Sequence, residues 1–403
     1  TYRMRFFTIA LLLGCTYFSF AQTTEGLFAH ITFDACDAQD DQGNLTGQVF
    51  GNPQCECGIF GQSLYLNGID DYLQFDGNLQ TVFTGDVTLS FYFRPEPTTN
   101  TYDLFSYRDQ CGLDSLFAVS YNGLTGDVAV EFIQNNNRHT TLVGKIEPGA
   151  CWQHIIFVKE DKIVRLYING ELKFEQRNSQ PILIVNNGLF EIANSSCLGG
   201  KLVRYHGFID DLRIYKRALP LREAVGLYVR PDQLLTSDTT ILLGASVQTA
   251  IAPSCATSVS WSPFTSVANP ADGNTSISPA QTTQYFITFQ NSGCITRDSL
   301  IITVVDPSAL DCNNLAIPNA FTPNGDGLND EFKISNPYVF DELIEFSVYS
   351  GLGEKLFSTT NAYEGWNGYY HDQVLNPGMY VYRIDYRCSG QQLSKSGGVA
   401  LIR

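Results

Sequence analysis

The sequence predicts an all-β protein, and three observations support this fold class. The 403 residues include 34 glycines, and turn dipeptides such as Asn169-Gly170 divide the chain into short segments, as in proteins built from strands and tight turns. Many of these segments are rich in Tyr, Phe, Val and Thr and alternate between apolar and polar residues. No long stretch has the apolar spacing of an amphipathic helix, and the best helical candidate is the short segment Pro220 to Tyr228.

The hairpin around Asn169-Gly170 is the clearest local prediction. Alternate apolar residues from Val164 to Ile168 share one face of the first strand. Asn-Gly suits a two-residue type I′ turn, which needs positive φ at both central positions. We therefore expect Leu172 and Phe174 to return to the same buried face in the second strand.

The N-terminus has the composition of an export signal. Met4-Arg5 is followed by a mostly apolar run that is too short for a stable membrane span. Small residues at Ser19 and Ala21 predict a signal peptide over residues 1–21, with cleavage after Ala21. A lipoprotein signal with lipidation at Cys15 is the alternative, because residues 12–15 also fit a lipoprotein box.

The net charge of −16 narrows the choice of partners. Nucleic acid and anionic membrane surfaces carry negative charge and would repel the chain. The charge is also usual for exported proteins, so it does not identify a partner.

The cysteines agree with an oxidising compartment. Without Cys15, ten remain, and they fall six, two and two into three regions along the chain. The ten are Cys36, Cys55, Cys57, Cys111, Cys151, Cys197, Cys255, Cys294, Cys312 and Cys388. If pairs stay within one region, Cys255–Cys294 and Cys312–Cys388 follow. The first six allow 15 connectivities, and these alternatives remain open.

Residues 22–230 resemble the laminin-G-like, concanavalin A-like jelly roll. The resemblance rests on residues 61–75, the core strand 87–93, residues 152–170 and the closing segment 207–219, all in the order of that family. It implies two antiparallel sheets packed face to face.

Residues 231–306 resemble a small immunoglobulin-like sandwich of the polycystic-kidney-disease (PKD) type. The segment Ser258 to Pro263 is similar to the tryptophan-bearing core strand of that family, and residues 283–289 and 299–304 are similar to its last strands. We expect Trp261, like Trp152 in the preceding domain, to be a core residue. The expected role of this domain is that of a spacer.

Residues 310–403 resemble the gliding-motility-associated C-terminal domain of proteins exported by type IX secretion. The opening segment 317–332, the segment Gly351 to Phe357 and the last residues 395–403 carry the resemblance. It implies a C-terminal β-sandwich sorting domain. It also implies recognition by the type IX translocon and a partner outer-membrane protein, and a location outside the cell or on its surface.

Calcium is the metal that the sequence favours, because carboxylates and amides supply the oxygens that Ca²⁺ binds. Related jelly rolls hold a structural calcium between the first and the closing strand, which implies Asp34 with Asp210 or Asp211 here. A weaker candidate is the loop with Asn324, Asp326, Asn329 and Asp330, which a turn without an ion also explains. No other cofactor is expected.

Enzyme motifs are not found. Retaining glycosidases need two carboxylates about 5 Å apart, and the spacing that jelly-roll glucanases use is absent. Asp210-Asp211 should point to opposite faces of a strand. The five histidines lack zinc spacing, namely His30, His139, His154, His206 and His371. We therefore expect no catalytic residues.

The sequence thus predicts an exported binding protein, either glycan-binding or adhesin-like. A structural surface protein that self-associates into filaments or a matrix is the alternative, and a glycan hydrolase is a weaker one. The ligand-binding residues are not identified by the sequence. Candidates in expected loops or at strand edges are Tyr102, Tyr107, Arg108, Asp109, Arg204, Tyr205 and His206.

Overall fold

The computed structural model describes residues 23–402 apart from 113, 147–150, 201, 292, 307–310, 325–328 and 372. The expected signal peptide and the alternative lipidation residue Cys15 lie outside the described residues. Strands account for 51% of the structure and helices for 4%, which confirms the all-β class. In the described part of the chain, no helix is long and apolar enough to cross a membrane.

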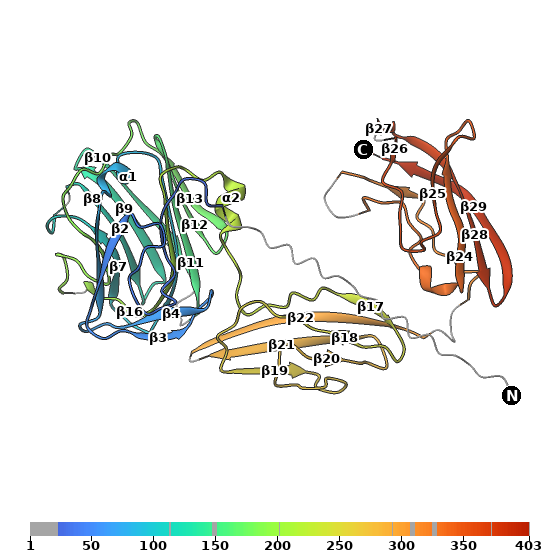
Figure 1. Cartoon of the computed structure of the whole chain (residues 1–403), viewed down its shortest axis with the longest axis horizontal. Helices are drawn as coiled ribbons and strands as arrows, with labels where there is room; N and C mark the ends of the chain where they lie inside the picture. The colour runs from blue at the N-terminus through green and yellow to red at the C-terminus, as the bar shows by residue number, and fades with distance from the viewer. Residues whose placement is uncertain are drawn as a thin grey trace. The chain divides into compact units, whose positions relative to one another are not determined.

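The N-terminal domain is a sandwich of two large sheets (Figure 1). The first, called the β6 sheet, has the order β13-β12-β11-β6-β16-β4-β3, and β1 also pairs with β16. Its strands are β1 (Leu27–Ile31), β3 (Gln54–Cys57), β4 (Gln62–Asn67), β6 (Val87–Pro95), β11 (Gln153–Glu160), β12 (Ile163–Ile168), β13 (Glu171–Arg177) and β16 (His206–Tyr215).

The second sheet, called the β7 sheet, has the order β10-β9-β8-β7-β14-β5-β2, and β15 also pairs with β7. Its strands are β2 (Leu45–Phe50), β5 (Tyr72–Gly77), β7 (Thr101–Tyr107), β8 (Leu116–Asn122), β9 (Asp127–Asn135), β10 (Arg138–Lys145), β14 (Phe190–Ile192) and β15 (Leu202–Arg204). Two short helices, α1 (Gln80–Phe83) and α2 (Leu221–Gly226), complete the domain, and α2 lies where the sequence predicts a helix.

The core of this domain fills the space between the two sheets. Inward-facing residues alternate along the strands, and aromatic rings from opposite sheets touch. The ring centroids of Phe91 and Phe105 lie 4.4 Å apart, and those of Phe132 and Phe157 lie 5.4 Å apart. Burial of such large apolar side chains is the main force that holds the two layers together.

The predicted hairpin is present, but its second strand differs from the prediction. A bulge falls between the pairs Leu166↔Phe174 and Tyr167↔Leu172. The extra residue shifts the register by one, so Phe174 packs on the core and Leu172 is 49% exposed. The expected burial of Leu172 is therefore wrong, because the alternation does not continue through a bulge.

The middle segment contains a four-stranded sheet of order β17-β22-β21-β19 and a two-stranded sheet of β18 and β20. The strands are β17 (Thr239–Leu242), β18 (Val247–Gln248), β19 (Ser258–Ser262), β20 (Ser276–Ile277), β21 (Thr283–Asn291) and β22 (Cys294–Val305). Trp261 is 4% exposed and donates a hydrogen bond to the carbonyl of Asp272, so it is a core residue as predicted. The PKD-type family assignment stays a prediction.

The C-terminal domain has a five-stranded sheet of order β23-β29-β28-β24-β25 and a small hairpin of β26 and β27. Its elements are β23 (Ala320–Phe321), the 3-10 helix η2 (Pro337–Val339), β24 (Glu342–Tyr349), β25 (Lys355–Thr359), β26 (Tyr369–Tyr370), β27 (Gln373–Val374), β28 (Gly378–Cys388) and β29 (Gln391–Leu401). Trp366, which is 1% exposed, lies in a core of its own with Phe321 and Phe332.

The disulfides correct one sequence prediction. Cys312–Cys388 is present as predicted, whereas Cys255 bonds to Cys57 and Cys294 bonds to Cys151. The predicted pair Cys255–Cys294 is therefore wrong. Two bonds between regions leave an even count in each, so the even counts did not require pairing within a region. The remaining pairs are Cys36–Cys55 and Cys111–Cys197.

The chain divides into two compact units. Unit 1 contains the residues up to 237 together with 248–277 and 284–300, and unit 2 contains 238–247, 278–283 and 301–403. Unit 1 therefore holds the jelly roll and most of the middle segment, including all four cysteines that link the two.

Candidate functional site

A row of outward-facing side chains crosses the β7 sheet. Strand pairing aligns Gln74 with Glu191, Glu191 with Ser106, Ser106 with Ala118 and Ala118 with Glu131. The residues before and after each of these five belong to the core. Because side chains alternate along a strand, the five must lie together on the opposite, outer face of the sheet.

Glu191 is the centre of this row. Its Oε1 accepts hydrogen bonds from Gln74 Nε2 at 2.7 Å and from Asn194 Nδ2 at 2.6 Å. Its Oε2 has no hydrogen-bond partner among the described residues, and the side chain is partly exposed. The carboxylate is thus held in place through one oxygen, and the other is open to a ligand's hydroxyl or amide group.

Aromatic side chains lie beside this carboxylate. Phe50 and Tyr72 stack in parallel with ring centroids 4.4 Å apart. The guanidinium of Arg204 lies 4.6 Å from the centre of the Tyr72 ring, and its Nη1 donates to Asn194 Oδ1 at 2.6 Å. Contacts therefore run without a break from the stacked rings through Arg204 and Asn194 to Glu191.

A shallow depression of about 440 Å³ opens next to Glu191. It is lined by Arg108, Asp109, Asn187, Gly188, Leu189, Glu191, Asn194, Ser195 and Ser196. The backbone at Gly188 approaches the Arg108 carbonyl so closely that a Cβ would lie 2.2 Å from its oxygen. Only glycine allows this approach, which holds two walls of the depression together.

Asp103 lies beneath the depression and is 2% exposed. Its Oδ2 accepts a hydrogen bond from Ser195 Oγ at 2.5 Å, whereas its Oδ1 is buried without a partner. Burial raises the pKa of Asp103 to about 7, against the lowering effects of Ser195 and Arg108, and the nearby Glu191 carboxylate raises it further. Desolvation of a charged carboxylate is the physical cause.

The disulfide Cys111–Cys197 joins the loops on either side of the depression. The two Cα atoms are 4.8 Å apart. Arg108 precedes Cys111 in one loop, and Ser195 precedes Cys197 in the other, where Ser195 Oγ also accepts the Cys197 N–H. The bond therefore fixes the two walls before any ligand arrives.

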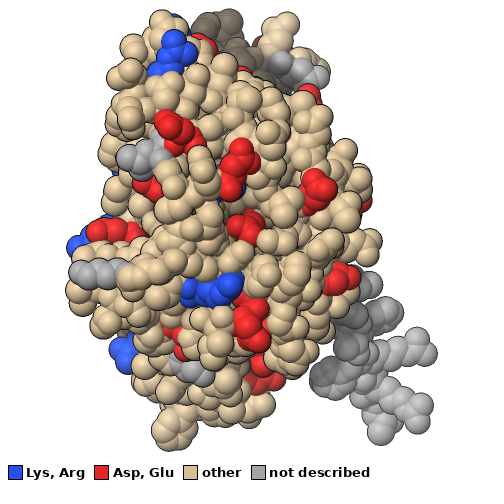
Figure 2. Space-filling view, turned by 90° about the vertical axis from the view of Figure 1, so that its left-hand side faces the viewer, with Lys and Arg blue, Asp and Glu red and all other residues tan. Residues whose placement is uncertain are grey.

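Figure 2 views the molecule from the side on which β7, β8 and β10 lie in Figure 1. Uncharged side chains cover most of this surface, and acidic and basic side chains are scattered over it. No broad basic area is visible there. A neutral, hydroxyl-rich partner suits such a surface better than a polyanion.

Some of the candidate ligand residues from the sequence fall at this site and others do not. Arg108 and Asp109 line the depression, and Arg204 lies on the Tyr72 ring. By contrast, Tyr102, Tyr107 and Tyr205 are core residues with at most 4% exposure, and His206 bonds to the Tyr65 hydroxyl.

Sequence reasoning missed Glu191, Asn194, Gln74 and Phe50. The alternation of Leu73, Gln74 and Phe75 marks Gln74 as outward-facing. Nothing local, however, shows that β14 lies between β5 and β7, which is what brings Glu191 to Gln74.

Of the first predicted calcium residues, Asp210 and Asp211 lie on β16 of the β6 sheet, and Asp34 lies in the turn that follows β1. Asp34 Oδ1 accepts the Gln62 N–H at 2.8 Å, and Asp210 Oδ2 accepts the Ile59 N–H at 2.6 Å and the Phe60 N–H at 3.2 Å. Both carboxylates thus secure the loop that joins β3 to β4.

Asp210 is fully buried, and its Oδ1 has no partner. Burial raises the pKa of Asp210 to about 8, partly offset by the backbone N–H of Phe60, and the neighbouring Asp211 carboxylate raises it further.

Asp211 does not point away from Asp210 as the sequence suggested. A bulge between Asp210 and Arg213, with Asp211 at φ 50°, inserts an extra residue in β16. Asp211 Oδ1 therefore meets His30 Nε2 at 2.8 Å and Arg213 Nη2 at 2.9 Å. Burial alone would raise the pKa of Asp211, but the His30 hydrogen bond and the Arg213 charge lower it below the ordinary value.

Four of the six oxygens of these three carboxylates bind protein groups, which leaves Asp34 Oδ2 and Asp210 Oδ1 for an ion that takes six to eight oxygens. The calcium site stays a prediction. Among the residues that the structure describes, no cluster of three or more His, Cys, Asp or Glu side chains is placed to hold a metal. In the weaker candidate loop, Asp326 lies outside the described residues, and Asn324, Asn329 and Asp330 lie at its ends.

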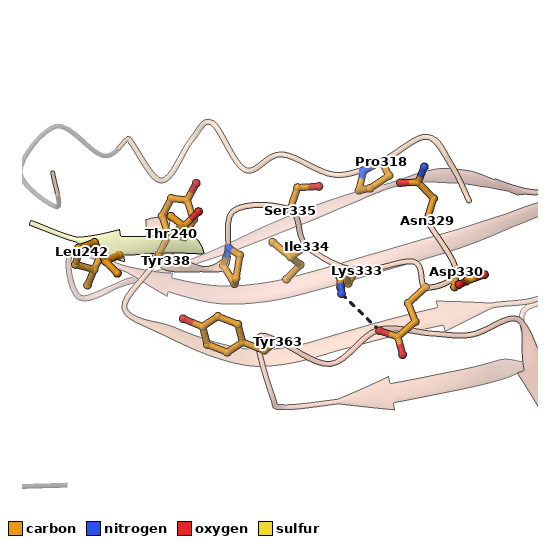
Figure 3. A pocket seen from close by; sticks show the side chains of 13 residues that line it. Thr240, Leu242, Pro318, Asn329, Asp330, Lys333, Ile334, Ser335, Tyr338 and Tyr363 are labelled. Atoms are coloured by element: carbon orange, nitrogen blue, oxygen red, sulfur yellow. Dashed lines mark ion pairs between the residues drawn. The ribbon is translucent and has the colours of Figure 1, made fainter. Parts of the chain in front are cut away.

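A larger depression, about 770 Å³, occurs in unit 2 (Figure 3). Its lining includes Tyr338, Tyr363 and Ile334, and Lys333 lies 3.7 Å from Glu331. Glu331 in this depression therefore has a cation as partner, whereas Glu191 has no ion pair among the described residues.

These features define a modular β protein with a jelly roll at one end and a separate C-terminal β domain at the other. Residues 67–224 match the family described as "Concanavalin A-like lectin/glucanases superfamily", and residues 315–401 match the "CHU_C Type IX secretion signal domain". Both resemblances drawn from the sequence are confirmed. The chain is exported to the cell surface or the extracellular space, as the secretion signal domain indicates.

Three solved structures are similar to parts of this chain. Domain 4 of AbnA, a GH43 extracellular arabinanase from Geobacillus stearothermophilus in complex with arabinotriose, is 24% identical, with 50% of this chain and 98% of that chain covered and a TM-score of 0.41. The binding domain of Paraclostridial Mosquitocidal Protein 1 is 19% identical, with 50% and 52% covered and a TM-score of 0.41. The botulinum neurotoxin serotype D binding domain is 12% identical, with 68% and 74% covered and a TM-score of 0.44.

Identities of 24% or less and TM-scores of 0.44 or less do not support an inference about ligand or activity. No curated protein matches the chain.

Proposed function

We propose that this chain is an exported glycan-binding protein whose site is the outer face of the β7 sheet around Glu191. One observation carries the proposal: a carboxylate with one open oxygen lies beside stacked aromatic rings and a depression of about 440 Å³. Sugars present hydroxyl groups that a carboxylate accepts and apolar ring faces that cover aromatic side chains.

The charges favour a neutral glycan. Glu191, Asp109 and the buried Asp103 are acidic, and the two arginines at the site already bind protein groups. Arg204 contacts Tyr72 and Asn194, and Arg108 donates to Ser106 Oγ at 2.9 Å. An acidic polysaccharide would therefore meet net repulsion at this site.

Binding fits the site better than hydrolysis. An acid catalyst must reach the glycosidic oxygen, whereas Asp103 is 2% exposed and lies beneath Ser195. Its raised pKa therefore belongs to a buried structural carboxyl. A self-associating surface protein without a sugar ligand remains the alternative, and the experiment below separates it from the proposal.

The proposal is tested with the full exported chain on an array of neutral and acidic polysaccharides. We expect saturable binding to neutral members and a loss of about fivefold in Phe50→Ala, since Phe50 and Arg204 cover the Tyr72 ring, the Phe50 ring has a side that faces away from Tyr72, and stacking on an aromatic ring supplies on the order of 1 kcal/mol. Tyr363→Ala, which removes a 71% exposed tyrosine from the C-terminal domain, is the control and should bind as wild type. Polymers with no binding to any polysaccharide would support the self-associating alternative and contradict the proposal.

A second proposal concerns export. The C-terminal domain matches a type IX secretion signal domain, and we propose that the translocon and a partner outer-membrane protein recognise it in folded form. Its disulfide Cys312–Cys388 and its own core support a domain that folds by itself.

A further inference from the structure

Two disulfides connect the jelly roll to the middle segment. Cys57, at the end of β3, bonds to Cys255, and Cys151, two residues before β11, bonds to Cys294. The Cα atoms are 5.6 Å and 5.0 Å apart, and the bonds span 198 and 143 residues of sequence. Because both bonds connect distant parts of the chain, they change the shortest covalent path through the molecule.

This path is short between the C-terminal domain and the jelly roll. Cys294 is the first residue of β22, whose 12 residues end at Val305, just before the C-terminal region. From Cys294 the disulfide leads directly to Cys151. The peptide between these two cysteines forms a closed loop, which contains strands β11–β21 and therefore most of the middle segment.

The structure around Cys151 should resist a pulling force applied through the Cys151–Cys294 bond. The strand that follows, β11, pairs with β6 on one side and β12 on the other. Trp152, between Cys151 and β11, packs with Ile59, Tyr92 and Phe208. A pull on Cys151 therefore acts on a strand held by two hydrogen-bonded ladders and a buried aromatic cluster.

We propose that these disulfides have a mechanical function: they carry tension between the jelly roll and the C-terminal domain and keep strands β18–β21 out of the path of the force. Cys151–Cys294 is the primary path, and Cys57–Cys255 is a longer one that takes over if the first bond is absent. The middle segment is then a covalently braced connector and no longer a simple spacer. This inference goes beyond glycan binding and does not depend on the ligand.

Single-molecule pulling on the full oxidised chain tests the proposal. One handle is attached through an alkyne-bearing residue at position 124, because Leu124 is 68% exposed in the turn between β8 and β9. The other handle is attached at the C-terminus. We expect residues 152–293 to add no length to the fully extended molecule, so that β22 is the part of the middle segment that extends under force.

Serine variants should lengthen the extended molecule by predictable amounts, at about 3.5 Å per residue. Cys151→Ser/Cys294→Ser forces the path through Cys57–Cys255 and should add roughly 28 nm. Replacing Cys57, Cys255, Cys111 and Cys197 as well removes every shorter route and should raise the gain to roughly 50 nm. Cys36→Ser/Cys55→Ser removes a bond outside the path and should leave the length unchanged.

An oxidised wild-type molecule that extends as far as the variant without all six of these cysteines would overturn the proposal. A molecule longer than expected by roughly 15 nm would also overturn it, since a Cys255–Cys294 bond, reached through Cys111–Cys197, gives that length. If the serine variants do not fold, the wild-type length alone still decides between these outcomes. Glycan binding has no part in the readout, so the result is separate from the proposed function.

Discussion

The outer faces of the β7 sheet and of the C-terminal five-stranded sheet treat charge in opposite ways. On β24, β25 and β28 the charges are paired within the sheet: Glu345 Oε1 lies 2.5 Å from Lys355 Nζ, and Arg383 Nε lies 2.9 Å from Asp385 Oδ2. On the β7 sheet, Glu191 has no ion-pair partner among the described residues, and Asp103 is buried with an unpartnered oxygen. A carboxylate that is already paired with a cation is less available to a ligand, whereas a carboxylate without an ion pair can accept hydrogen bonds from one.

The disulfide bonds of the two regions also differ. In the C-terminal domain, Cys312–Cys388 closes a single domain. In unit 1, Cys111–Cys197 joins the walls of the depression, and two further bonds tie the jelly roll to the middle segment. Covalent bonds thus concentrate where we place binding and the transmission of force.

The largest expected effect is on export, which should depend on the C-terminal domain and not on the site in the jelly roll. Deletion of residues 310–403 should abolish export, because the matched secretion signal domain is removed. Cell fractionation with an antibody against the jelly roll measures it. Glu191→Gln is the matched control and should reach the exterior at wild-type levels, and export of the deleted chain would refute the assignment.

A smaller effect is expected when the walls of the depression are released. Cys111→Ser/Cys197→Ser should weaken binding to the best neutral polysaccharide of the array several-fold, since a preorganised site loses less entropy on binding. It should also lower the free energy of unfolding by about 2–4 kcal/mol. Calorimetric titration and urea unfolding measure the two effects. Cys36→Ser/Cys55→Ser should lose stability but keep its affinity, and equal affinity losses in both variants would contradict the role of the Cys111–Cys197 bond.

The buried carboxyls predict a pH effect on stability. The pKa of Asp210 is raised to about 8 and that of Asp103 to about 7, so the folded state keeps protons that the unfolded state releases near pH 4. Stability should therefore fall as pH rises from 4 to about 8. His154 acts in the opposite sense below pH 6.5, because burial lowers its pKa to about 3.

The window from pH 6.5 to 8 isolates the carboxyls. Thermal unfolding should show a falling Tm for wild type and a nearly constant Tm for Asp210→Asn, with a smaller change for Asp103→Asn below pH 7. A slope that persists in the double variant would show that other groups cause the pH dependence.

The smallest effect is expected on the C-terminal sheet. Lys355→Ala removes an exposed ion pair with Glu345, and exposed pairs contribute little because water screens them. The Tm should not change measurably, and neither export nor binding should respond. A clear loss of export would instead mark this face as part of the secretion signal.

The sequence predicted those features of the fold whose pattern lies within a short, contiguous segment. The segment 317–332 identified the C-terminal domain because its turn residues and apolar positions are contiguous. The fold of the jelly roll followed from alternation and turns in the same way. The bulges at Asp211 and Lys173 were missed, because a bulge leaves no mark on the alternation until the partner strand is known.

The candidate site was harder to predict because it is assembled from distant parts of the chain. Arg108, Asp109 and Arg204 were noticed as polar residues near strand ends. Glu191 was not, since its partners Gln74 and Asn194 become meaningful only when β14 lies between β5 and β7. Counting cysteines failed for a related reason, as two bonds between regions give the same even counts as bonds within them.

The most direct test of the central claim is a calorimetric titration of Glu191→Gln and Glu56→Gln with the neutral polysaccharide that binds wild type best. Both variants lose one carboxylate charge, but Glu56 lies on β3 of the β6 sheet. We predict that Glu191→Gln weakens binding about tenfold or more, because a hydrogen bond to a charged acceptor contributes about 1.5–3 kcal/mol, and that Glu56→Gln binds as wild type. Wild-type affinity in Glu191→Gln would contradict a binding site on the β7 sheet.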